Sequence, residues 1–154
     1  MRKEKMFKNK KGFTLIEMLV VIAIIAVLVA IIIPVIGNST IKASAAANAA
    51  NLRSYASEIA IIYLDPGDDF TVKLGDAAQK TGAQLITVTG TGVPTAPTAK
   101  KCGTIFNPEK LPTAKCFLVN GQVVAAFADT YTPKSNDVEY FAKMAETGTT
   151  PSFT

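Results

Sequence analysis

The residues with the clearest chemical potential lie together near the start of the chain, between Gly12 and Glu17. Glu17 is a carboxylate at the entrance of an apolar run, where a charge deep in a membrane costs roughly 2.5–3.5 kcal/mol and needs a partner. A cut between Gly12 and Phe13 would give Phe13 an α-ammonium group one helical turn before Glu17. The carboxylate also suits the positive end of the helix dipole. We therefore predict an ammonium–carboxylate pair, either within one chain or between chains packed side by side.

The element that positions this pair is the apolar run itself. Met18 to Ile33 are sixteen consecutive apolar residues. As a helix rising about 1.5 Å per residue, the whole segment 13–36 is long enough to span a bilayer. It is apolar on all sides, which indicates lipid or a crowded helical bundle around it. Pro34 removes a backbone hydrogen bond, and with Gly37 it predicts a kink in the helix.

Charge divides the chain at Gly12. Residues 1–12 carry six basic side chains and one acidic one, whereas the remainder carries ten basic and eleven acidic side chains, a net charge of −1. Basic residues beside an apolar span stay on the cytoplasmic side of the membrane. No platform of aromatic and basic residues follows the leader, so we expect no nucleic-acid partner.

The composition argues against an enzyme. Histidine is absent, which excludes imidazole-based catalysis and imidazole metal ligands. No phosphate loop, nucleophile elbow or pair of catalytic carboxylates is visible, and we expect no cofactor. Asp65, Asp68 and Asp69 are weak candidates for calcium ligands. A solvated acidic loop is the simpler interpretation of these three residues.

Cys102 and Cys116 lie beyond the apolar span, on the side of the membrane where disulfides are permitted. A bond between them would close a loop of about 15 residues, worth roughly 3 kcal/mol in the chain-entropy model. We predict this disulfide. The alternative is two free, buried thiols.

The rest of the chain predicts an α+β domain. Residues 37–64 form an amphipathic helix that ends at the breaker Asp65-Pro66-Gly67. Its apolar stripe comprises Ile41, Ala45, Leu52, Tyr55, Ala56, Ile59, Ile62 and Tyr63, with Asn48 among the polar residues of the remaining surface. In the head, residues 65–154, a strand is expected from Gln84 and a β-hairpin around Asn120-Gly121. We expect a long N-terminal helix packed on a small antiparallel sheet, with a C-terminal helix opened by a capping box at 136–139.

Lys10-Lys11-Gly12-Phe13-Thr14-Leu15-Ile16-Glu17, with a short basic leader before it and an apolar span after it, resembles the signal sequence of type IV prepilins. The short leader is most similar to the type IVa group. The resemblance covers about the first 40–50 residues. It implies cleavage after Gly12 by a membrane-embedded prepilin peptidase and N-methylation of Phe13. Glu17 and Phe13 would then act in assembly, and a proline such as Pro34 is frequent within such helices.

The resemblance gives a leader (1–12) and a transmembrane or filament-core helix (13–36). The pattern of the remaining residues adds the amphipathic half of the long helix (37–64) and a globular head (65–154). The resemblance also concerns assembly. It implies a homopolymer assembled by an ATPase and a membrane platform. The precursor would sit in the cytoplasmic membrane with its head outside, and the product would be an extracellular pilus serving adhesion or motility. A pseudopilin of a type II secretion or competence system is the alternative in this class. Outside it, the alternatives are a plain signal anchor and a secreted module cut near Ala43-Ser44-Ala45.

Overall fold

The computed structural model describes residues 12–77, 82–127 and 137–151. It contains two helices and four strands in the order α1, β1, β2, β3, β4, α2. The chain divides into two compact units, Met1–Ile36 and Gly37–Thr154, and helix α1 (Leu15–Leu64) contributes to both. Its end at Leu64 is where the sequence predicted it. Each unit is described by itself.

The first unit consists of the apolar part of α1. In the part of the chain that the structure describes, α1 is the one helix long and apolar enough to cross a membrane. The large apolar side chains described here, from Phe13 to Ile33 and at Ile36, are between 45% and 82% exposed. Pro34 lies inside the helix. No side chain described among residues 12–36 is buried, so this part of the unit presents apolar surface on every side.

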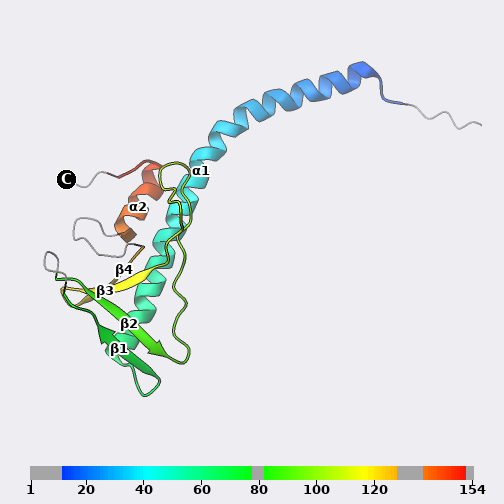
Figure 1. The fold of residues 1–154 in the computed structure, drawn as a ribbon. Coiled ribbons are helices and arrows are strands. Elements are labelled where there is room, and N and C mark those ends of the chain that lie inside the picture. The colour runs from blue at the N-terminus through cyan, green and yellow to red at the C-terminus, as the bar shows by residue number, and fades with distance from the viewer. Residues whose placement is uncertain (1–11, 78–81, 128–136, 152–154) are drawn as a thin grey trace, which may run out of the picture. The chain divides into compact units, whose positions relative to one another are not determined.

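The second unit is built on a four-stranded antiparallel sheet with the strand order β1-β2-β3-β4 (Figure 1). The strands are β1 (Phe70–Leu74), β2 (Gln84–Gly90), β3 (Lys115–Val119) and β4 (Gln122–Ala126). Phe70 pairs with Gly90, Leu85 with Phe117, and Cys116 with Ala125. The α+β fold, with a long N-terminal helix on a small antiparallel sheet, is as the sequence predicted.

The hairpin between β3 and β4 turns at Asn120-Gly121. Both residues have positive φ angles, 50° and 79°. A two-residue type I′ turn requires positive φ at both central positions, which asparagine and glycine tolerate best. The predicted hairpin is confirmed. β1 was not predicted, and it extends the sheet by one strand.

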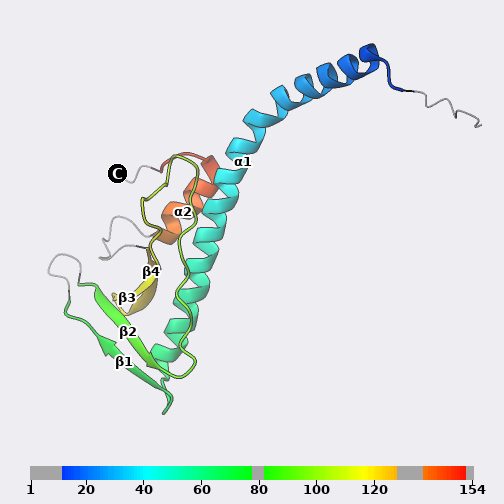
Figure 2. The same ribbon diagram turned by 45° about the vertical axis from the view of Figure 1, so that its right-hand side comes forward.

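The connection between β2 and β3 runs beside α1, as both ribbon views show (Figures 1 and 2). Bridges between Thr98 and Thr113 and between Cys102 and Phe106 hold it in a defined path. At Gly103 the chain has a φ of 59°, and a Cβ there would lie 2.9 Å from the side chain of Ile41. Glycine therefore allows the connection to approach α1 closely at this point.

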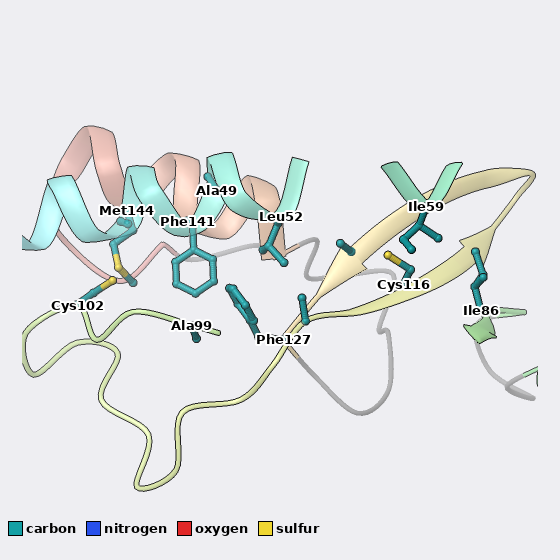
Figure 3. Packing of buried hydrophobic residues seen from close by; sticks show 13 residues of the cluster. Ala49, Leu52, Ile59, Ile86, Ala99, Cys102, Cys116, Phe127, Phe141 and Met144 are labelled. Atoms are coloured by element: carbon teal, nitrogen blue, oxygen red, sulfur yellow. The ribbon is translucent and has the colours of Figure 1, made fainter. Parts of the chain in front are cut away.

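The core of the second unit lies between α1, the sheet, α2 (Asp137–Thr147) and this connection (Figure 3). Phe141 of α2 is 1% exposed and makes edge-on ring contacts with Phe106 and Phe127, at centroid distances of 5.0 and 5.8 Å. Such contacts add to the hydrophobic stabilisation from burial. The buried side chains that α1 contributes are Ala45, Asn48, Ala49, Leu52, Ile59 and Ile62.

One of these residues, Asn48, is a correction to the sequence analysis, which placed it on the polar side of the helix. Asn48 is 0% exposed, and its side-chain amide binds the backbone of Lys100 in both directions. The N–H of Lys100 donates to Oδ1 at 2.7 Å, and Nδ2 donates to the carbonyl oxygen of Lys100 at 2.8 Å. Burying a polar side chain is tolerable when its hydrogen bonds are satisfied. Asn48 thereby fastens the long connection to α1.

Helix α2 begins at Asp137, a half-buried carboxylate that bonds to the residue directly after β4. The backbone N–H of Phe127 donates to Oδ2 of Asp137 at 2.6 Å. Burial raises the pKa of Asp137, and this hydrogen bond partly opposes the rise. The predicted capping residue Asn136 lies outside the described residues. The predicted helix itself is observed, with Glu146 in its last turn.

Candidate functional site

The predicted cleavage position lies directly before α1. Gly12, Phe13 and Thr14 belong to neither helix nor strand, and all three are exposed. Phe13 is 81% exposed. A Cβ added at Gly12 would meet no atom within 4 Å. The Gly12–Phe13 peptide bond is therefore in an accessible, non-helical segment, which is the form of backbone that a peptidase can bind.

Thr14 and Glu17 form a reciprocal cap at the start of α1. The backbone N–H and the hydroxyl of Thr14 each donate to Oε2 of Glu17, both at 2.8 Å. The N–H of Glu17 donates back to the Thr14 hydroxyl oxygen at 3.3 Å, and the Thr14 carbonyl accepts from the N–H of Met18. This is a capping box, with Thr14 as the N-cap and Glu17 three residues into the helix. It satisfies backbone groups that a helix start otherwise leaves unpaired.

The capping box adds a contact that the sequence analysis did not predict. α1 begins at Leu15, so Phe13 lies just before the helix, and in the uncut chain the Glu17 carboxylate accepts hydrogen bonds from Thr14. Phe13 carries an ammonium only after cleavage, so its pairing with Glu17 stays a prediction. The sequence analysis did not identify Thr14, although Thr-x-x-Glu before an apolar run is the pattern that signals a capping box.

The predicted disulfide is a second correction, since Cys102 and Cys116 are both free and buried. Nδ2 of Asn48 lies 3.6 Å from Sγ of Cys102, whereas Cys116 lies in β3 and pairs with Ala125 and Ile86. Figure 3 shows the two sulfurs at opposite ends of the core, one near Met144 and the other near Ile59. The two thiols are therefore separate core side chains.

Burial raises the pKa of the Cys116 thiol to about 12. Burial also raises the pKa of the Cys102 thiol, and the hydrogen bond from Asn48 partly opposes that rise. Only the thiolate is an effective nucleophile.

We expect that iodoacetamide at pH 8 without reductant leaves the native protein unmodified, and that both thiols are alkylated once the protein is unfolded in guanidinium. Intact mass measures both steps. An unfolded chain that takes up the label only after reduction would contradict the free thiols.

The three acidic residues around Pro66-Gly67 do not form a metal site in the structure. Asp65, Asp68 and Asp69 are all exposed. Within residues 12–77, 82–127 and 137–151, no three His, Cys, Asp or Glu side chains gather closely enough to hold a metal ion. The turn precedes β1, and the N–H of Phe70 bonds to the carbonyl of Pro66. Its observed role is to join α1 to the sheet.

Comparison with known proteins supports the site at the start of α1. Residues 7–33 match the prokaryotic N-terminal methylation motif. The match includes Gly12, Phe13, Thr14 and Glu17 and the whole apolar run from Met18 to Ile33. Comparisons with curated proteins and with solved structures gave no match. The chemistry indicated is a modification of the new N-terminus, next to a helix that fits a membrane-anchored precursor.

Proposed function

We propose that this chain, whose residues 7–33 carry the signature of the leaders of type IV pilins and pseudopilins, is the major structural subunit of a type IV pilus. The observation that carries the proposal is the apolar part of α1, which lies within that signature and just beyond it and exposes its large side chains. An exposed apolar surface of this extent needs lipid or protein to cover it. The medium-sized head, residues 65–154, favours a major pilin over a secretion pseudopilin.

Processing prepares the subunit for assembly. A prepilin peptidase would cut after Gly12, remove the basic leader and methylate the amine of Phe13. The precursor waits in the cytoplasmic membrane with its leader inside and its head outside. Its assembly ATPase and membrane platform then transfer it into an extracellular filament, which serves adhesion or motility.

In the filament the apolar part of α1 holds the subunits together, and Glu17 sets the register between neighbouring subunits. Lipid already covers apolar surface well, so moving this part of α1 from lipid into protein gains little from the hydrophobic effect. The gain depends on close packing and polar contacts. An ammonium–carboxylate contact between copies is directional and is strong where water is excluded. In this proposal each arriving subunit stops where its Phe13 ammonium meets the Glu17 carboxylate of a copy already in place.

The proposal is tested by Glu17→Gln. Glutamine keeps the acceptor oxygen that the capping box uses but carries no charge. We expect normal cleavage after Gly12 and at least about a tenfold loss of sheared filaments, because a charge-assisted hydrogen bond is worth roughly 1.5–3 kcal/mol. Glu17→Ala should also be cut and assemble poorly. Mass spectrometry of the membrane fraction measures cleavage, and electron microscopy with quantified sheared protein measures assembly.

Glu109→Gln is the matched control, because Glu109 is an exposed residue of the head. It should form filaments at the wild-type level. A wild-type filament yield from Glu17→Gln would show that assembly does not use the charge of Glu17.

A further inference from the structure

An open polar groove lies in the second unit, between α1 and the connection from β2 to β3. Its volume is about 230 Å³. Four of the side chains that line it follow the spacing i, i+3, i+4 and i+7, which places them on one face of α1. The lining residues are Asn51, Ser54, Tyr55 and Glu58 of α1 and Thr95 and Pro97 of the connection. The proposed assembly does not use this groove.

The wall opposite α1 is held in place by backbone hydrogen bonds. The carbonyl oxygen of Pro97 accepts from the N–H of Ala114 at 2.8 Å, and the N–H of Ala99 donates to the carbonyl oxygen of Pro112 at 2.9 Å. Both ribbon views show this connection running beside α1 (Figures 1 and 2). A groove whose walls are already in place binds a ligand without the cost of ordering a loop.

The polar groups of the groove have hydrogen-bonding capacity left for a ligand. The Ser54 hydroxyl donates to Oε1 of Glu58 at 3.2 Å, and among the described residues no hydrogen bond or ion pair reaches Oε2. Burial raises the pKa of Tyr55, and the Glu58 carboxylate adds to the rise. The Tyr55 phenol therefore stays neutral and able to donate at physiological pH.

The chemistry of the lining groups matches a neutral sugar. Hydroxyl and amide groups both donate and accept hydrogen bonds, as the hydroxyls of a sugar do, and a carboxylate accepts from hydroxyls. Tyr55 contributes an aromatic ring, which can pack against the C–H side of a sugar ring. None of the six lining residues is basic, which disfavours a phosphate or carboxylate ligand. The volume is below the roughly 300–1,000 Å³ of sites for drug-sized ligands, so it suits a single sugar ring.

We propose that this groove binds a neutral pyranose, a six-membered sugar ring, whose hydroxyls bond to Asn51 and Glu58 and whose C–H face packs against Tyr55. The inference goes beyond the proposed function, because the groove lies within one subunit and does not depend on assembly. A filament would repeat the groove in every copy. Weak binding by one groove would then become avid binding to a surface that carries many sugars.

The test titrates the labelled full chain with the methyl glycosides of glucose, galactose, mannose and N-acetylglucosamine. The detergent is a polyoxyethylene ether, which carries neither a sugar nor an ammonium group. We expect at least one glycoside to bind with a Kd on the order of 1 mM, as suits an open groove with few contacts. Binding should shift the amide NMR signals of residues 51–58 and 95–97. Choline is the counter-probe, because a carboxylate beside an aromatic ring can also bind a quaternary ammonium.

Two matched pairs of variants locate the binding. Glu58→Ala should raise the Kd at least about tenfold, because hydrogen bonds to a charged group are strong, whereas Glu109→Ala should bind as the wild type does. Ser54→Ala should raise the Kd about threefold to tenfold, and Ser57→Ala, the same change outside the groove, should not. All four side chains are exposed, so these substitutions should leave the fold intact.

Three results would overturn the inference: no binding of any of the four glycosides, with or without binding of choline; NMR shifts confined to residues outside 51–58 and 95–97; or the wild-type affinity in Glu58→Ala. None of these results bears on filament assembly, which Glu17→Gln tests separately. Failure of the sugar site and failure of the proposed function are therefore distinguishable.

Discussion

Gly12→Leu is expected to stop cleavage completely and to leave the whole chain, leader attached, in the membrane. A peptidase must bring the backbone of the cut bond against its catalytic groups, and a residue without a side chain permits that approach. A Cβ at Gly12 meets no atom within 4 Å, and the residue lies outside α1. The substitution should therefore leave the fold intact, so that a loss of cleavage reports on the peptidase step alone. The intact mass of the membrane-bound protein measures the result, and sheared filaments should be absent.

Two alanine variants serve as controls, one at Gly12 and one at Gly37. Gly12→Ala should slow cleavage less than leucine does, because a methyl group obstructs the peptidase less. Gly37→Ala makes the same chemical change at a second glycine with open space around it, and it should be cut normally. Filaments made of uncut Gly12→Leu protein would contradict the processing account.

Asn48→Ala is expected to destabilise the second unit, Gly37–Thr154, strongly. The substitution removes a fully buried amide that holds the part-buried N–H and C=O of Lys100 at 2.7 and 2.8 Å. The C=O then keeps only the weak bond from Sγ of Cys102 at 3.6 Å. A polar group left unsatisfied away from water costs about 1–3 kcal/mol, so we expect the free energy of unfolding to fall by about 2–4 kcal/mol. That is a large share of the roughly 5–15 kcal/mol that stabilises a typical domain.

Tyrosine fluorescence during denaturant unfolding of the full chain in detergent can measure this loss. The chain has no tryptophan, and all four tyrosines lie beyond residue 37, so the signal reports on the second unit. Asn51→Ala is the matched control: Asn51 lies one turn further along α1 and is only partly buried. It should shift stability by no more than about 0.5 kcal/mol, as surface changes usually do. Equal midpoints for Asn48→Ala and the wild type would contradict the role assigned to Asn48.

The parts of the fold that the sequence predicted well are those set by local chemistry. The breaker Asp65-Pro66-Gly67 ends α1 at Leu64 as expected, because proline and glycine act on their immediate neighbours. The hairpin at Asn120-Gly121 follows from the same local logic. β1 was missed although Phe70 to Leu74 alternates apolar and polar residues, because five residues give a weak strand signal next to an acidic turn.

The errors concern contacts between residues far apart in the chain. Asn48 was assigned to the polar side of the helix by residue type, and its partner, Lys100, lies 52 positions away. The disulfide was inferred from the spacing of two cysteines. Cys102, however, lies in the connection between β2 and β3, whereas Cys116 lies in β3 itself. Neither tertiary arrangement can be read from spacing alone. At the site, Gly12, Phe13 and Glu17 were identified from the sequence, whereas Thr14 required the hydrogen bonds of the capping box.

The most direct test of the central claim is the intact mass, with N-terminal sequencing, of the protein sheared from the cell surface. The account predicts a chain that begins at Phe13 and is one methyl group heavier than residues 13–154. A chain beginning near Ala46 would contradict it and indicate a secreted protein released by an ordinary signal peptidase. A chain that keeps its leader and is found only in membranes would also contradict it, and would indicate a plain anchor.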